Sequence, residues 1–437
     1  MVVLKTTQST PRLDLFEKFY FFLLVLYTGA NTPYTQVLLF PVRDHIFFMV
    51  IPFLLTVILL FRRNRMSFKR FVLPAIVFFG WIFLQLMKYG QVYPMTILYI
   101  YDFVLAYIIV TVYKKSLFFL YEKYVTFLSL IGLLVWVLYL FLPNEISKIM
   151  NSISLIPEND SLKSSIIIAT LSNDSSLLGM RNAGFSQEPG YYASLVCIAI
   201  YFNLILNRFV IKKNWNFLIL MASLVTTQST TGYVTLLIIL CFYAFSKKTE
   251  IKYWLMLCIA ILIPLAITLP FIGEKITNYL YNKDSKNNAA EMVLYNQKNN
   301  DFDVFVPQRL DAMVFDVINF INDPVLGYGV EENNSYISKK VSKNIILSQG
   351  NINMFGRYGI IIGICFVFCL LKTSKMISVY YEYKGSLFLF FLWLAISASY
   401  DFNRHPLLLS IWLFFIFTNP LIYNKRNENN IRYKQRG

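Results

Sequence analysis

Histidine and cysteine are scarce in this chain, which limits the metal and disulfide chemistry that it can support. The 437 residues include two histidines, His45 and His405, and five cysteines. Four cysteines lie inside apolar runs and Cys369 lies near the end of one, so we expect no disulfide framework in the loops. A zinc site built from His and Cys is not expected either. The scarcity of His and Cys therefore predicts no zinc site, and nothing in the sequence points to a cofactor.

Long polar stretches are also missing, and none has the ordinary composition of an independent soluble domain. Instead, 57% of the residues are hydrophobic, mean hydropathy is +0.54, and apolar runs recur from one end of the chain to the other. This composition predicts an all-α, polytopic integral membrane protein in a single membrane domain, residues 1–437.

Apolar windows long enough to cross a bilayer indicate about twelve transmembrane helices. They lie near residues 16–30, 45–61, 71–87, 95–113, 117–142, 190–206, 214–227, 231–245, 252–272, 352–371, 386–400 and 406–423. An even number of spans places both termini on the same side of the membrane.

The formal net charge of +16 might suggest a nucleic-acid partner, but the positions of the basic residues argue against one. Short clusters of Lys and Arg lie between apolar runs on the side that carries both termini. The short loops of the other side carry only Arg43, Lys88 and Arg404. By the positive-inside rule the basic side, with both termini, is cytoplasmic. The predicted partner is membrane lipid, with no nucleic acid.

Two large extracytoplasmic loops, 143–189 and 273–351, remain on the outer side, where function on an external substrate would lie. The second begins with an Asn- and Lys-rich stretch of low complexity. From 308 to 323, apolar residues then recur at the i, i+3, i+4, i+7 spacing of an amphipathic helix. Pro307 precedes this helix and Pro324 follows it.

The first loop ends with Arg181 and Glu188, directly before a hydrophobic helix that Pro189 is suited to begin. Glu188 would lie at the helix N-terminus, where the dipole stabilises a carboxylate or an anionic ligand. Arg181 is either a functional cation or an interfacial anchor. Glu188 is either a general base or a residue that caps the helix or orients Arg181. The tyrosines that follow, Tyr192 among them, could bind the rings of a substrate by stacking.

The second loop supplies another arginine, Arg309, near the start of its amphipathic helix. Arg309 would point along the membrane surface or pair with Asp316. A glycine-containing turn with Tyr328 follows, then a polar run that ends near Asn334. The chain re-enters the membrane through a stretch that contains Arg357.

The order of these motifs resembles the Wzy-type O-antigen or capsular polysaccharide polymerases, which are related to the O-antigen ligases. The resemblance covers most of residues 180–371. It is carried by Arg181 with Phe185-Ser186-Gln187-Glu188-Pro189, by the Ser-Thr-Thr-Gly-Tyr start of a span at 229–233, by Asp-Pro-Val-Leu-Gly-Tyr-Gly at 323–329, by Asn-Ser-Tyr at 334–336, and by Asn-Met-Phe-Gly-Arg-Tyr-Gly-Ile at 353–360.

The resemblance implies a metal-independent integral-membrane glycosyltransferase in the bacterial cytoplasmic (inner) membrane. It would join undecaprenyl-pyrophosphate-linked oligosaccharide repeat units at the outer face, with a chain-length regulator protein as a further partner. The family's essential loop arginines would correspond to Arg181 and Arg309. The Arg-to-Gly spacing of the family is not kept in one form here. Asn333-Asn334 stand where the related ligases carry a His, which favours polymerase over ligase.

The chemistry of the residues agrees with this interpretation. Guanidinium groups bind phosphate bidentately and stabilise the charge on a departing pyrophosphate. A carboxylate would take the proton of the acceptor hydroxyl, and Glu188 is the first candidate. Asp401, Arg404 and His405 form a second polar cluster on the same side, which either binds substrate or anchors a loop.

Asp102 is a carboxylate inside a predicted span, which makes it a candidate for function or for a structural hydrogen bond. Two other functions stay open for the whole chain, a flippase or exporter of the same lipid-linked glycans and an O-antigen ligase. Transporters usually have short loops and paired repeats, whereas one outer loop here has nearly eighty residues.

Overall fold

Most of the chain that the computed structural model describes is helical. It describes residues 13–37, 54–62, 68–90, 94–152, 162–165, 168–172, 180–186, 188–246, 304–305, 309–341, 344–345, 350–402 and 405–418. In this part of the chain, five helices are long and apolar enough to cross a bilayer: α3 (Lys69–Tyr89), Thr96–Tyr113 of α4 (Pro94–Tyr113), α5 (Ser116–Phe141), α7 (Pro189–Leu206) and α15 (Asn351–Tyr380). A helical membrane-spanning protein, as the sequence predicts, is compatible with these helices.

Most of the other predicted spans are also helical, although twelve crossings stay a prediction. The further helices at these positions are α1 (Leu15–Val37), α8 (Trp215–Thr226), α9 (Thr230–Ser246) and α16 (Phe388–Ser397). The predicted span 352–371 is longer in the structure and reaches Tyr380. In place of an unbroken span over 406–423, the described residues form two short helices, α17 (Pro406–Trp412) and α18 (Phe414–Phe417). The predicted span 252–272 lies outside the described residues.

The contacts between residues divide the chain into two units. Unit 1 comprises Met1–Met66, Ile108–Asp174 and Met180–Gln228, and unit 2 comprises Ser67–Tyr107, Ser175–Gly179 and Ser229–Gly437. The single domain expected from the sequence stays a prediction.

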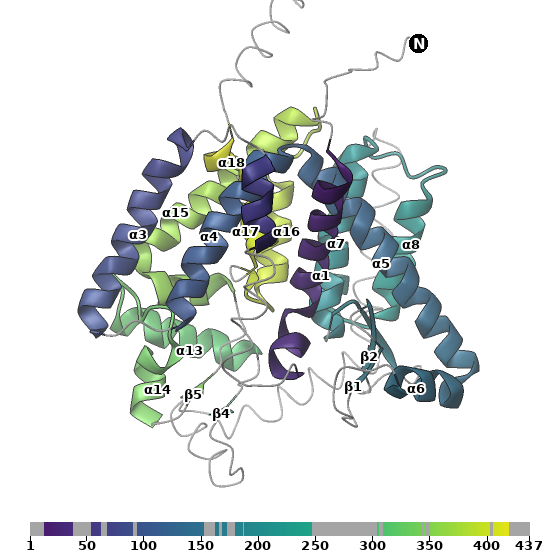
Figure 1. Cartoon of the computed structure of the whole chain (residues 1–437), viewed down its shortest axis with the longest axis horizontal. Coiled ribbons are helices and arrows are strands. Elements are labelled where there is room, and N and C mark those ends of the chain that lie inside the picture. The colour runs from purple at the N-terminus through teal and green to yellow at the C-terminus, as the bar shows by residue number, and fades with distance from the viewer. Residues whose placement is uncertain are drawn as a thin grey trace, which may run out of the picture. The chain divides into compact units, whose positions relative to one another are not determined.

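In unit 1, helices α5, α7 and α8 pack against one another, and α1 packs against α5 (Figure 1). α7 is apolar on every face and almost entirely buried, as expected for a helix at the centre of a membrane bundle. A buried carboxylate between these helices is hydrogen-bonded, as burial requires. Glu122 of α5 accepts hydrogen bonds from Asn203 and Asn216 at 2.8 and 3.0 Å.

The first long loop contains more regular structure than an all-α prediction includes. It forms a short helix, α6 (Pro143–Ser152), and an antiparallel sheet of β1 (Leu162–Ser165), β2 (Ala169–Ser172) and β3 (Arg181–Gly184). Trp136 of α5 donates a hydrogen bond of 2.7 Å from its indole to the carbonyl of Met180, directly before β3. The sheet is thereby fixed to the end of a membrane helix.

Unit 2 is built around α15, which packs against α16, α17, α18 and α13 (Arg309–Asn322). α9 packs against α16 through stacked rings of Phe242 and Phe388, whose centroids are 4.4 Å apart. The second loop also contributes the short parallel strands β4 (Val304–Phe305) and β5 (Asn344–Ile345), the 3-10 helix η3 (Glu332–Asn334) and α14 (Tyr336–Val341).

Helix α13 confirms the predicted amphipathic helix to within one residue at each end, and its polar face is the buried one. Asp316 and Asn319 are 0% and 1% exposed, whereas Val314 and Ile321 of the apolar stripe are 50% and 67% exposed. An apolar face turned outward is typical of a helix that lies against lipid. α13 lies at the end of α3 where Tyr89 contacts Asp323 (Figure 1). It therefore covers a polar interior at one end of the unit.

Candidate functional site

The candidate site lies where the membrane helix α15 is interrupted. Gly359 has φ 70° and ψ 179° inside this helix, a conformation that only glycine adopts readily. The loop after α13 fills the break and forms backbone hydrogen bonds with it. The amides of Tyr328 and Gly329 donate to the carbonyls of Gly356 and Arg357, at 2.9 and 3.1 Å, and the amide of Ile360 donates to Pro324 at 2.8 Å.

Glycines permit this close approach between the loop and the helix. A Cβ atom at Gly359 would overlap the carbonyl oxygen of Val325, and one at Gly327 would overlap the carbonyl of Arg357. Gln85 of α3 stabilises the same junction. Its side-chain amide donates to the carbonyls of Leu326 and Arg357, at 2.6 and 2.8 Å. The loop and the two helices therefore hold Arg357 in one position.

Arg357 is the centre of a buried polar cluster. Its side chain is 1% exposed, and every guanidinium nitrogen has a partner. Nη2 donates to Oε1 of Glu332 and Nη1 donates to the hydroxyl of Tyr99, both at 2.6 Å, while Nε donates to the hydroxyl of Tyr328 at 3.2 Å. Oδ2 of Asp401 lies 3.9 Å from Nη1. The guanidinium thus fixes the position of two carboxylates that come from different parts of the sequence.

A third carboxylate, Asp316 of α13, lies close enough to interact with this charge cluster. Its oxygens accept no hydrogen bond from any residue that the structure describes. Burial raises the pKa of Asp316 well above its usual range; Arg357 lowers it in part, and Asp401 and Glu332 raise it further. The cluster therefore combines a permanent cation with carboxylates and a side chain that favours its protonated form.

The two adjacent glutamates differ in their surroundings. Burial raises the pKa of Glu332, although Arg357 acts in the opposite direction. Half-burial also raises the pKa of Glu331, and the negative charge of Glu332 adds to this effect. Glu332 keeps a side-chain exposure of 17% and Asp401 one of 10%, so both carboxylates are accessible from outside the cluster.

Four of the predicted substrate-binding residues belong to this region. Tyr328, Arg357 and Asp401 are in the cluster, and Asn334 follows Glu332 in the same turn of η3. His405 lies at the start of α17, where burial lowers its pKa to about 4, so the imidazole is neutral at pH 7. A neutral imidazole does not supply a cation for phosphate. Arg404 lies outside the described residues.

The structure places Arg181 in β3 of unit 1, where it is half-buried. Its Nε donates a 2.9 Å hydrogen bond to the carbonyl of Thr227, just beyond α8. Next to it, the side-chain amide of Asn182 donates to the hydroxyl of Thr226 at 2.9 Å. These contacts hold β3 against the end of α8.

Glu188 is exposed and lies at the N-cap position of α7, with Pro189 at the start of the helix as predicted. Its side chain makes no capping hydrogen bond, so the interpretation of Glu188 as a side-chain cap is wrong. Tyr192 is fully buried, and its ring lies edge-on to Phe185 with centroids 5.6 Å apart. A sugar would reach Tyr192 only if this contact opened.

Arg309 is the first residue of α13 in unit 2, and its side chain lies outside the described part of the structure. The pairing of Asp316 with Arg309 stays a prediction, because the side chain of Arg309 is outside the described residues, while that of Asp316 is buried near the Arg357 cluster. Arg181 and Arg309 belong to different units. Their convergence on one pyrophosphate stays a prediction.

Several residues of the cluster were not predicted as site residues from the sequence. Tyr99 and Gln85 lie in apolar spans, among many tyrosines and without a motif around them. Asp316 could have been recognised as a candidate, because its carboxylate lies next to the apolar stripe of the predicted amphipathic helix, three residues after Met313. Glu332 was visible only as part of a polar run.

Comparisons with known proteins identify no relative. The chain matches no protein-family model, no curated protein and no solved structure.

Proposed function

We propose that this protein is an O-antigen or capsular polysaccharide polymerase. It transfers a growing glycan from undecaprenyl pyrophosphate to a sugar hydroxyl of an incoming lipid-linked repeat unit, at the outer face of the bacterial cytoplasmic membrane. The hydroxyl oxygen forms a bond to the anomeric carbon of the donor sugar, and the bond from that carbon to pyrophosphate breaks. A carboxylate takes the hydroxyl proton, and undecaprenyl pyrophosphate leaves with the electron pair.

The observation that carries this proposal is the Arg357 cluster. Carboxylates with raised pKa values gather around a buried guanidinium at the interrupted end of a membrane helix. α13 lies beside them with an apolar face turned outward. A substrate with a long lipid tail and a sugar headgroup needs such a place, where an apolar surface meets proton-accepting groups.

Glu332 is the best-placed base in this cluster. Arg357 fixes its orientation through a 2.6 Å contact, and its partial exposure leaves it reachable. Its raised pKa makes it a stronger proton acceptor than a fully solvated carboxylate. Glu188 of unit 1 is the alternative base, since it is exposed at the N-terminus of α7. Glu332→Gln and Glu188→Gln separate the two assignments when polymer is compared at equal levels of folded protein, because only loss of the true base then abolishes polymer.

Arg181 and Arg309 are the groups that we assign to the departing pyrophosphate. Arginine stays charged in a partly dehydrated site and donates two parallel hydrogen bonds to phosphate, which lysine does not. Arg181 lies in β3, where its Nε donates to the carbonyl of Thr227. Arg→Lys at either position should therefore restore activity only in part.

Glycan banding in a deletion strain tests the proposal. Deletion should reduce the surface glycan from a ladder to a single repeat unit, and the wild-type gene should restore the ladder. Arg181→Ala and Arg309→Ala should give the single-repeat pattern at normal protein levels. Arg208→Ala, an exposed arginine in the turn before α8, is the matched control and should keep the ladder. Polymer of normal length and abundance from both loop variants would show that these arginines were assigned wrongly.

A flippase is the second candidate, and one observation favours it. Transporters use interrupted helices to build sites within the membrane, and the break at Gly359 lies beside the protonatable Asp316. The same deletion strain separates the functions. Loss of a flippase removes every surface repeat unit, whereas loss of a polymerase leaves single repeats.

A further inference from the structure

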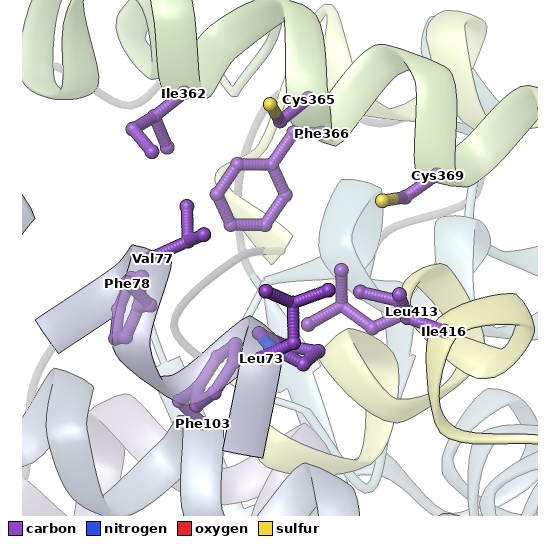
Figure 2. A pocket seen from close by; sticks show the side chains of 11 residues that line it. Leu73, Val77, Phe78, Phe103, Ile362, Cys365, Phe366, Cys369, Leu413 and Ile416 are labelled. Atoms are coloured by element: carbon purple, nitrogen blue, oxygen red, sulfur yellow. The ribbon is translucent and has the colours of Figure 1, made fainter. Parts of the chain in front are cut away.

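An apolar pocket in unit 2 lies apart from the Arg357 cluster. It has a volume of about 210 Å³ and is lined only by apolar and thiol side chains. Figure 2 shows Leu73 and Val77 of α3, Cys365 and Cys369 of α15, and Leu413 and Ile416 at α17 and α18 around one space. The side chains that line such a space lack van der Waals contacts on one side unless an apolar group fills it.

The pocket opens to the outer surface of these helices. Leu73, Val77 and Cys365 are exposed although they line it, and so are Ile361 and Ile364 beside it. These side chains form a surface that suits the bilayer interior. An apolar occupant would therefore enter from the membrane.

Three cations lie at one end of this pocket. On α3, Lys69 and Arg70 precede the lining residues Leu73 and Pro74 by four positions, so each lies one helical turn away on the same face. On α15, Lys372 lies seven residues after Cys365, again on the lining face, and its ammonium group is 5.1 Å from the ring of Phe368. In the described part of the chain, none of these three cations forms a salt bridge.

The apolar space suits a hydrocarbon chain and the cations suit an anionic headgroup, so the two features together suit one lipid molecule. We propose that the pocket holds an acyl chain of an anionic glycerophospholipid whose phosphate lies against Lys69, Arg70 and Lys372. Helix–helix surfaces in a bilayer gain little from burying apolar area alone. The headgroup contacts therefore decide which lipid is bound, as in other basic pockets between membrane helices. This site is independent of the proposed polymerase reaction.

Native mass spectrometry of the full-length protein tests the proposal, with phosphatidylglycerol and phosphatidylcholine added in equal amounts. We expect the protein to retain phosphatidylglycerol at least about tenfold more than phosphatidylcholine. Each cation near the membrane surface contributes roughly a fivefold preference for anionic lipid. Cys369→Trp fills the pocket and should remove the bound lipid. Ile364→Trp places the same ring on the bilayer-facing surface outside the pocket and should retain it.

A charge variant tests the headgroup contacts without changing the pocket. Lys69→Gln, Arg70→Gln and Lys372→Gln together should make the two lipids bind equally. The control removes three charges elsewhere, with Lys123→Gln, Lys212→Gln and Lys384→Gln, and should keep the preference for phosphatidylglycerol. This comparison stays informative if Cys369→Trp does not fold.

Three results would overturn the proposal. The first is equal retention of both lipids by the wild-type protein. The second is an unchanged preference in the triple charge variant. The third is displacement of phosphatidylglycerol from the wild-type protein by a polyprenyl phosphate, because the pocket would then belong to the lipid carrier of the reaction.

Discussion

The pairing of Arg357 with Glu332 makes a quantitative prediction about stability. Arg357→Gln removes a guanidinium that is 1% exposed and leaves the carboxylate of Glu332 without its 2.6 Å partner. The hydroxyls of Tyr99 and Tyr328 lose a donor as well. Removing one member of a buried ion pair typically costs about 3–5 kcal/mol, because the remaining charge stays buried and unpaired. We expect a loss of stability in this range.

The double variant Arg357→Gln, Glu332→Gln distinguishes a charge effect from loss of packing. With both charges removed, no uncompensated carboxylate remains from this pair, so the double variant should be more stable than Arg357→Gln alone. Glu332→Gln alone should also be destabilising, because the buried guanidinium then has only the more distant Asp401 as a counter-ion. The coupling between the two substitutions should exceed about 1 kcal/mol, as is common for residues in one buried network.

Thermal unfolding in detergent, followed by tryptophan fluorescence at one fixed heating rate, is the assay. Inactivation half-lives should accompany it, because membrane proteins often unfold irreversibly. The control pair is Lys88 and Asp323 of the same unit, whose side chains are 36% and 21% exposed. The same cycle there should give a coupling of no more than about 1 kcal/mol. Equal coupling in the two cycles, or a double variant no more stable than Arg357→Gln, would refute the reasoning.

Two further predictions follow from the same region. Gly359→Ala should destabilise the protein by about 1–3 kcal/mol in thermal unfolding, because φ is positive and a Cβ would overlap the carbonyl of Val325. Gly80→Ala, in the middle of α3 with open space around it, should be neutral or stabilising, and a Gly359 variant as stable as this control would contradict the strain argument. Asp316→Asn should stabilise the protein at neutral pH. Burial raises the pKa of Asp316 in the folded state, so the wild type loses stability as pH rises above the pKa of this group in the unfolded chain, which is near 4. Asparagine does not titrate and avoids this loss. The gain, measured from pH 4 to pH 8, should shrink toward the acid end, and a gain independent of pH would show that Asp316 does not titrate in this range.

The sequence alone determined which segments form apolar helices and where several of them begin. Hydropathy and helical periodicity are local properties, so α3, α5, α7 and the bounds of α13 could be predicted from them. Pro189 begins α7 for a local reason too, since proline lacks an N–H and fits the first helical position. The order of loops and spans also predicted Tyr328, Arg357 and Asp401 on one side of the membrane, and the structure places these three residues in one cluster.

Tertiary structure decided what these residues contact. Arg357 pairs with Glu332, 25 positions earlier, and with Tyr99, 258 positions earlier, and no local pattern specifies either contact. Gly359 breaks a helix that hydropathy presents as continuous, because the loop at 324–329 bonds to the backbone there. The burial of Asp316 likewise depends on which face of α13 meets α15. Helical spans arise from interactions between near neighbours, whereas a buried charge cluster exists only after distant segments have packed together.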